Sequence, residues 1–208
     1  MSVLASAPAF NLRDAELQLA DFRAWLKATP YCNESKIVTK LESLPALCPL
    51  IGMYDGSKYP TVQKFEFEIQ GVFRADFVAG NLATRHFVLV EFEGAERNSV
   101  FGPGGTNQMR YWGNQIQHGF SQIADWSWAK NDSQHSRIFQ SALGVDESSE
   151  TYVLICGRLR SLVDHEQSRL FWRHRKTSIA NCRILFQTYD DLAEHFESAL
   201  DFARSFSA

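Results

Sequence analysis

Three carboxylates are placed so that two neighbouring strands could bring them together. Asp76 lies in the run RADFVAG, and Glu91 and Glu93 lie at the end of the run HFVLVEFEG. Because side chains alternate across a strand, Glu91 and Glu93 share one face, and antiparallel pairing of the two runs can put Asp76 beside them. Carboxylates at this density repel one another unless a cation neutralises them, and hard oxygen ligands suit Mg²⁺ or Mn²⁺. The pattern is compatible with a divalent-metal centre able to activate water, and the alternative is an edge strand with solvated carboxylates.

A second set of polar side chains falls on one face of a predicted helix over residues 107–129. Gln115, His118 and Gln122 are three and four residues apart, so they project from the same side of that helix. If this face meets the carboxylates, it could position a metal-bound water or a phosphate oxygen. The alternative is a solvated polar face opposite the apolar side chains of the helix, which are Trp112, Ile116, Phe120, Ile123 and Trp126.

Positive charge is concentrated between residues 158 and 183, in a chain whose net charge is −3. Seven basic residues stand there against two acidic ones, which gives this stretch a net charge of +5. Such a stretch could follow a phosphate backbone, or it could pair with the acidic side chains of the last predicted helix. The basic residues are Arg158, Arg160, Arg169, Arg173, Arg175, Lys176 and Arg183.

Hydrophobic periodicity predicts the elements that position these groups. Helices are expected over residues 14–28, from Asn33 to Leu44, over 164–180 and from Thr188 to the end of the chain. A three-stranded meander is expected between residues 64 and 94, with further strands over 151–159 and 182–187. Residues 98–108, which contain the run GPGG, are expected to form a loop. The order of elements predicts an α/β fold with a central mixed sheet flanked by helices.

Composition narrows the class of protein. The chain has 208 residues, of which 45% are hydrophobic and 22% charged, as in an ordinary core-forming protein. It contains no apolar run of the roughly 20 residues that a bilayer requires, so no membrane contact is expected. Four cysteines without CxxC or CxxH spacing indicate reduced thiols and a cytoplasmic location, and zinc is not expected. No phosphate-binding loop or dinucleotide fingerprint occurs.

Several of these runs, taken in chain order, resemble the Shedu immune nuclease domain, a branch of the PD-(D/E)XK nuclease superfamily. The runs are RADFVAG, FVLVEFEGAE, a helix ending in QIADW, YVLICGRLR and RILFQTYDDLAEHF. The resemblance covers roughly residues 34–200. It divides the chain into an N-terminal helical extension over residues 1–30 and a Shedu-like nuclease domain over residues 31–208.

The resemblance implies a restriction-endonuclease-like αβββαβ core with an additional C-terminal strand and helix. In that core Asp76 and Glu91 would bind Mg²⁺ or Mn²⁺, Glu34 would add a further acidic ligand, and Gln122 would orient substrate or water. The usual motif ends in ExK, but this chain has Glu93 at the third position, where some restriction enzymes use glutamate as a general base or a second-metal ligand. Another side chain could supply the positive charge that the motif lysine normally provides, and the candidates are Arg85, Arg97, Arg110 and Lys130.

The resemblance implies a metal-dependent endonuclease that cuts or nicks DNA in anti-phage defence. We expect Gln115 and His118 to contact nucleic acid together with Arg158, Arg160, Arg173, Arg175 and Lys176. DNA is the expected partner, homo-oligomerisation is expected because family members often assemble, and a defence-system partner protein could provide sensing. The alternative is a nuclease fold without catalytic activity that binds nucleic acid or a protein partner.

Overall fold

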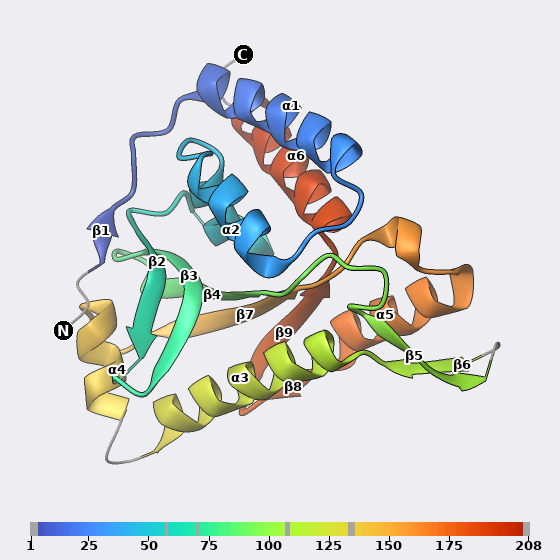
Figure 1. Cartoon of the computed structure of the whole chain (residues 1–208). Helices are drawn as coiled ribbons and strands as arrows, with labels where there is room; N and C mark the ends of the chain where they lie inside the picture. The colour runs from blue at the N-terminus through green and yellow to red at the C-terminus, as the bar shows by residue number, and fades with distance from the viewer. Residues whose placement is uncertain (1–3, 57, 70, 107–108, 133–135, 206–208) are drawn as a thin grey trace.

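A mixed seven-stranded sheet forms the centre of the molecule, in the order β1-β2-β3-β4-β7-β9-β8 (Figure 1). The computed structural model describes residues 4–56, 58–69, 71–106, 109–132 and 136–205. Strands β2 to β4 form an antiparallel meander, and β4, β7 and β9 run parallel. This arrangement confirms the predicted meander and the mixed α/β fold. The strands are β1 (Ala5–Ser6), β2 (Val62–Ile69), β3 (Phe73–Asn81), β4 (His86–Phe92), β7 (Ser149–Ile155), β8 (Ser178–Ile179) and β9 (Cys182–Gln187).

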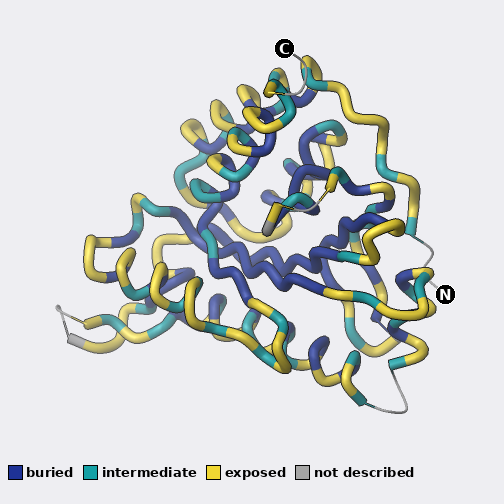
Figure 2. The backbone as a smooth tube through the Cα atoms, turned by 180° about the vertical axis from the view of Figure 1, so that it is seen from behind, coloured by how far each residue is buried: buried dark blue, intermediate teal, exposed yellow. Residues whose placement is uncertain are grey.

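Helices cover both faces of the sheet and enclose a hydrophobic core on each side. One face carries α1 (Leu12–Ala28), α2 (Glu34–Glu42), the 3₁₀ segment η1 (Cys48–Gly56) and α6 (Tyr189–Ser205). The other face carries α3 (Asn114–Asn131), α4 (Ser136–Leu143) and α5 (Asp164–Lys176). The strands between these layers are the most continuously buried part of the chain, and the exposed residues follow the outer sides of the helices (Figure 2).

Local sequence explains the best-defined elements. Every residue from Phe87 to Val90 is buried, because β4 contributes side chains to both cores, and this accounts for its unbroken apolar run. The side chains of Asn11 and Asn33 cap α1 and α2 by accepting hydrogen bonds from the backbone N–H groups of Asp14 and Lys36, three residues further on. Helix α1 packs against α6, with the rings of Phe22 and Phe196 5.9 Å apart, so it shares the core of the sheet domain.

The region before α3 differs from the prediction. The expected loop over 98–108 contains β5 (Phe101–Thr106), which pairs with β6 (Met109–Trp112) in a hairpin. Helix α3 therefore begins at Asn114 and not near residue 107; residues 107 and 108 lie outside the described part of the chain. The rings of Phe101 and Trp112 stack at 4.4 Å, and this cross-strand pair stabilises the hairpin despite the glycines between them.

Three smaller differences concern the second half of the chain. Strand β7 ends at Ile155 and not near 159, because Gly157 turns the backbone with a φ of 73°. Helix α5 ends at Lys176 and not at 180, because Thr177 adopts an extended conformation and Ser178–Ile179 form β8. The amphipathic helix α4 was not predicted.

No helix in the described residues has the length and apolar character needed to cross a bilayer.

Candidate functional site

The meander places Asp76 and Glu91 on neighbouring strands at the same level of the sheet. Phe77 of β3 pairs with Val90 of β4, so continuing this register puts Asp76 opposite Glu91. The Oδ2 atom of Asp76 accepts a hydrogen bond of 2.7 Å from the backbone N–H of Phe92. Both carboxylates are buried, Asp76 with 9% and Glu91 with 3% of its surface exposed. The sheet thus holds two acidic side chains in a position that hydrophobic residues normally occupy.

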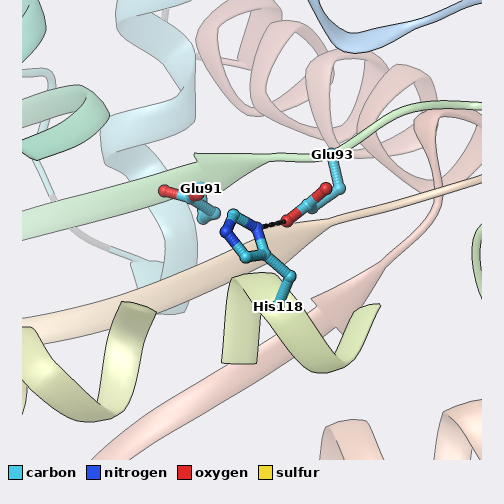
Figure 3. Close-up of side chains that lie close together, drawn as sticks. All are labelled: Glu91, Glu93 and His118. Atoms are coloured by element: carbon cyan, nitrogen blue, oxygen red, sulfur yellow. Dashed lines mark hydrogen bonds and ion pairs between the residues drawn. The ribbon is translucent and has the colours of Figure 1, made fainter. Parts of the chain in front are cut away.

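Helix α3 brings polar side chains against the end of β4 (Figure 3). The Nδ1 atom of His118 lies 2.7 Å from Oε1 of Glu93, and the side-chain amide of Gln122 donates to Oε1 of Glu91. These two contacts follow from the spacing of the residues. Side chains four residues apart on a helix and side chains two residues apart on a strand are separated by similar distances, so the pair on α3 can face the pair on β4. Gly119 permits the close approach, because a Cβ atom there would lie 2.4 Å from Leu154 and 3.1 Å from Glu93.

The carboxylates raise one another's pKa. Burial, together with the charges of Glu34 and Glu93, raises the pKa of Asp76 to about 7, although its hydrogen bond from Phe92 opposes the shift. Burial and then the charges of Asp76 and Glu93 raise the pKa of Glu91 to about 10. The pKa of Glu93 is also raised by burial, against the effect of His118. At neutral pH the cluster therefore holds protons that a divalent cation could displace.

Glu34 belongs to the electrostatic neighbourhood of the cluster. It is the first residue of α2, and its exposed carboxylate raises the pKa of Asp76, Glu91 and Glu93. Helix α2 contacts β4 from the face opposite α3. These four carboxylates therefore influence one another electrostatically, but the group whose ligand atoms lie within 4.8 Å of one another contains Glu91, Glu93 and His118 and does not include the predicted ligands Asp76 and Glu34.

The donor set fits a divalent cation. Glu91, Glu93 and His118 each offer one ligand atom, and these atoms lie within 4.8 Å of one another. The Oε2 atom of Glu91 is buried and has no hydrogen-bond partner among the described residues. A buried carboxylate oxygen without a partner is costly, and a bound cation would satisfy it. The cluster can therefore hold Mg²⁺ or Mn²⁺ through oxygen ligands, with His118 at its edge.

The residues expected to contact nucleic acid fall into different environments. Arg158 is buried, with its guanidinium bidentate on Asp190 at 2.9 Å and donating to the carbonyls of Leu26 and Thr29. It is not part of an exposed basic surface, which corrects the expectation for this residue and favours the predicted pairing with the last helix. Gln115 points to Glu96, at 3.3 Å, and not to the carboxylate cluster.

The remaining basic candidates lie at the ends of short elements on the surface. Arg160 in the 3₁₀ segment η2 (Leu159–Ser161) is exposed, as are Arg175 and Lys176 in the last turn of α5. Arg173 is half-buried, with its guanidinium 4.3 Å from the centre of the Trp112 ring. Arg175 lies 5.5 Å from the centre of the Phe171 ring, also in a cation–π arrangement. Arg160, Arg175 and Lys176 are therefore the accessible cations of this set.

Two of the four residues considered as a replacement for the motif lysine form ion pairs away from the acidic cluster. Arg110 pairs with the buried carboxylate of Glu166 at 2.6 Å, and Lys130 pairs with Glu150. Arg85 lies in the turn before β4, at the opposite end of that strand from Glu91. Arg97 is exposed in the segment after Glu93. None of the four contacts the acidic cluster through an ion pair among the described residues.

The sequence did not predict the contribution of Gly119, which allows α3 to approach the sheet. It did predict that the helix face of His118 and Gln122 could meet the carboxylates, and the structure places these side chains against Glu93 and Glu91. The sequence contained a signal for these contacts. Four residues along a helix and two along a strand cover similar distances, so His118 and Gln122 have the spacing needed to face Glu93 and Glu91.

The fold and the site define a mixed α/β protein with a nuclease-like core and acidic side chains in β3 and at the end of β4. Residues 32–193 match the family described as "Shedu protein SduA, C-terminal", so the chain belongs to the Shedu family. Membership of this family indicates a protein of anti-phage defence. No curated protein matches the sequence at a significant level.

Proposed function

We propose that the protein is a metal-dependent endonuclease that hydrolyses DNA phosphodiester bonds in anti-phage defence. The observation that carries the proposal is the set of buried carboxylates Asp76, Glu91 and Glu93, in which burial raises each pKa and the charge of a neighbouring carboxylate raises it further. Ionising these buried carboxylates costs free energy unless a cation neutralises them, and raised carboxylate pKa values are typical of catalytic and metal sites. Membership of an anti-phage defence family supports this assignment.

The residues divide the work as follows. A bound Mg²⁺ or Mn²⁺ would supply Lewis-acid chemistry and lower the pKa of a water molecule. Asp76 and Glu91 would hold the cation, with Glu34 as a further ligand from α2. Gln122 fixes the carboxylate of Glu91 through its side-chain amide. Glu93, whose pKa is raised by burial, would be a further ligand or the general base that accepts a proton from the attacking water.

The exposed basic side chains would hold the DNA backbone. Arg160, Arg175 and Lys176 are accessible, and α5 lies on the same face of the sheet as α3. Phosphate contacts from such side chains release counterions, so the affinity should fall steeply with salt. We also propose that the protein works as a homo-oligomer in the cytoplasm, with a defence-system partner protein.

A second candidate is a nuclease fold without catalytic activity that binds nucleic acid or a protein partner. The observation that favours it is the absence of the motif lysine, since Glu93 cannot supply positive charge to a pentacovalent phosphate. Arg110 and Lys130, which could have replaced that charge, are held by Glu166 and Glu150. Both candidates predict DNA binding, so only cleavage separates them.

Cleavage of supercoiled plasmid with Mg²⁺ or Mn²⁺ tests the proposal. The wild type should nick the plasmid, EDTA should stop it, and Asp76→Asn and Glu91→Gln should abolish it. Glu68→Gln removes an exposed carboxylate of β2 and is the matched control, which should retain full activity. Glu93→Lys restores the usual motif. Cleavage by this variant but not by the wild type would favour the inactive fold and refute the proposal.

A further inference from the structure

We propose that His118 is a direct metal ligand, and that with Glu91 and Glu93 it selects a divalent first-row transition ion such as Mn²⁺ over Mg²⁺. The inference rests on the proposed function, because it takes the acidic cluster as a cation site, and it deepens that function by naming the class of metal. The usual ExK motif provides only oxygen ligands and a lysine at this point. Here α3 supplies an imidazole nitrogen.

The geometry of the three side chains supports one shared ion. Their ligand atoms lie within 4.8 Å of one another. Ligand atoms around a single ion at roughly 2.1 Å are separated by about 3 to 4.3 Å, so rotations of the side chains by an ångström or less would suffice. The side chain of His118 is 66% exposed and can make that adjustment, whereas the strand holds Glu91 and Glu93 in place.

An independent observation concerns one buried oxygen atom of the cluster. The Oε2 atom of Glu91 is buried and accepts no hydrogen bond among the described residues, while its Oε1 atom is held by Gln122. The adjacent Glu93 is 4% exposed, and its Oε1 atom is contacted by the imidazole. One ion between these atoms would satisfy the orphaned oxygen and neutralise both carboxylates, which the imidazole by itself cannot do.

The chemistry of the donors determines the choice of metal. Mg²⁺ demands oxygen ligands in near-octahedral geometry and keeps several waters, whereas divalent first-row transition ions accept imidazole nitrogen, Mn²⁺ with the lowest affinity among them. A site of two carboxylates and one histidine therefore gains affinity for Mn²⁺ from the histidine and gains little for Mg²⁺. Replacing His118 should therefore reduce the difference between the affinity of the site for Mn²⁺ and its affinity for Mg²⁺.

A competing role for His118 is purely electrostatic. A protonated imidazole at 2.7 Å from Glu93 would act as an ion-pair partner, in place of the missing lysine. The two roles make opposite predictions for one substitution. His118→Lys preserves a positive partner for Glu93 but removes the ligand, whereas His118→Ala removes both.

Mn²⁺ binding to the full chain without DNA, followed by electron paramagnetic resonance, tests the proposal. Mg²⁺ affinity is measured by competition, and folding of each variant by its thermal midpoint. His118→Ala and His118→Lys should each weaken Mn²⁺ binding at least about tenfold, the scale of losing even a supporting group of a metal site. Mg²⁺ affinity should change by less than about threefold. His165→Ala, which removes an exposed histidine of α5, is the control and should bind Mn²⁺ as the wild type does.

Three results would overturn the assignment of His118. These are unchanged Mn²⁺ affinity in His118→Ala, retained affinity in His118→Lys, or equal losses for Mn²⁺ and Mg²⁺. The proposed nuclease function fails separately. If the wild type leaves plasmid intact while Mn²⁺ binding depends on His118, the metal site stands and the nuclease proposal is wrong.

Discussion

Replacing Asp76 by asparagine tests whether the acidic cluster is held in place against its own repulsion. Asparagine has nearly the same shape, and its side-chain oxygen can still accept the hydrogen bond from Phe92 that the carboxylate accepts at 2.7 Å. Only the charge is removed. The substitution therefore isolates the electrostatic cost of ionising this side chain inside the folded protein.

The direction of the effect follows from the pKa of Asp76, which is raised from 3.8 to about 7, chiefly by burial. The folded state binds this proton more tightly than the unfolded state, so stability is greatest at low pH and is lost as the pH rises through about 7. Each pH unit in that window costs about 1.4 kcal/mol. Between about pH 5 and pH 8, Asp76 alone should lower the free energy of unfolding by about 3 kcal/mol.

Urea denaturation in EDTA across about pH 5 to 8 measures this loss. The wild type should lose at least that amount, because Glu91 and Glu93 also have raised pKa values, and Asp76→Asn should lose about 3 kcal/mol less. Adding millimolar Mn²⁺ at pH 8 should restore stability to the wild type and much less to the variant. A wild type whose stability is constant or rises from pH 5 to pH 7, or a variant with an identical pH profile, would refute the reasoning.

Three further predictions concern residues around the site. Arg158→Ala should destabilise the protein by about 3 kcal/mol in urea denaturation, because a buried charge pair loses one partner; a loss below 1 kcal/mol would contradict its structural role. Gly119→Ala should push α3 from the sheet, cost about 1–3 kcal/mol through the clash with Leu154 and weaken Mn²⁺ binding. The double variant Arg175→Ala/Lys176→Ala should lower the salt dependence of DNA affinity by about two phosphate contacts in fluorescence anisotropy, with its thermal midpoint unchanged; an unaltered slope would remove these residues from the DNA surface.

Alternation and continuous apolar runs predicted the central strands because those patterns come directly from burial. Strand β4 is buried on both faces, and its run from Phe87 to Val90 has no polar interruption. The hairpin of β5 and β6 was missed, since FGPGGT carries glycine and proline, which disfavour strands. Its pairing depends on the contact between Phe101 and Trp112, which no local pattern reveals.

The candidate site could likewise be predicted where local periodicity fixes it, and not where packing between elements fixes it. The separation of Glu91 and Glu93 by two residues fixes their shared face whatever the tertiary structure. The rotation of α3 about its axis, which turns His118 and not Gln115 towards the carboxylates, is set by packing between elements. Arg158 was misassigned because a count of charge along the sequence does not distinguish a buried guanidinium from an exposed one.

The buried guanidinium of Arg158 joins the ends of two helix dipoles. It donates to carbonyls at the carboxyl end of α1, where the dipole is negative, and binds Asp190 at the amino end of α6, where the dipole is positive. Because mobile ions screen solvent-exposed charges far more than buried ones, this junction should persist at ionic strengths that dissociate DNA. A loss of the proposed DNA affinity during a salt titration should therefore leave the contact between α1 and α6 at Arg158 intact.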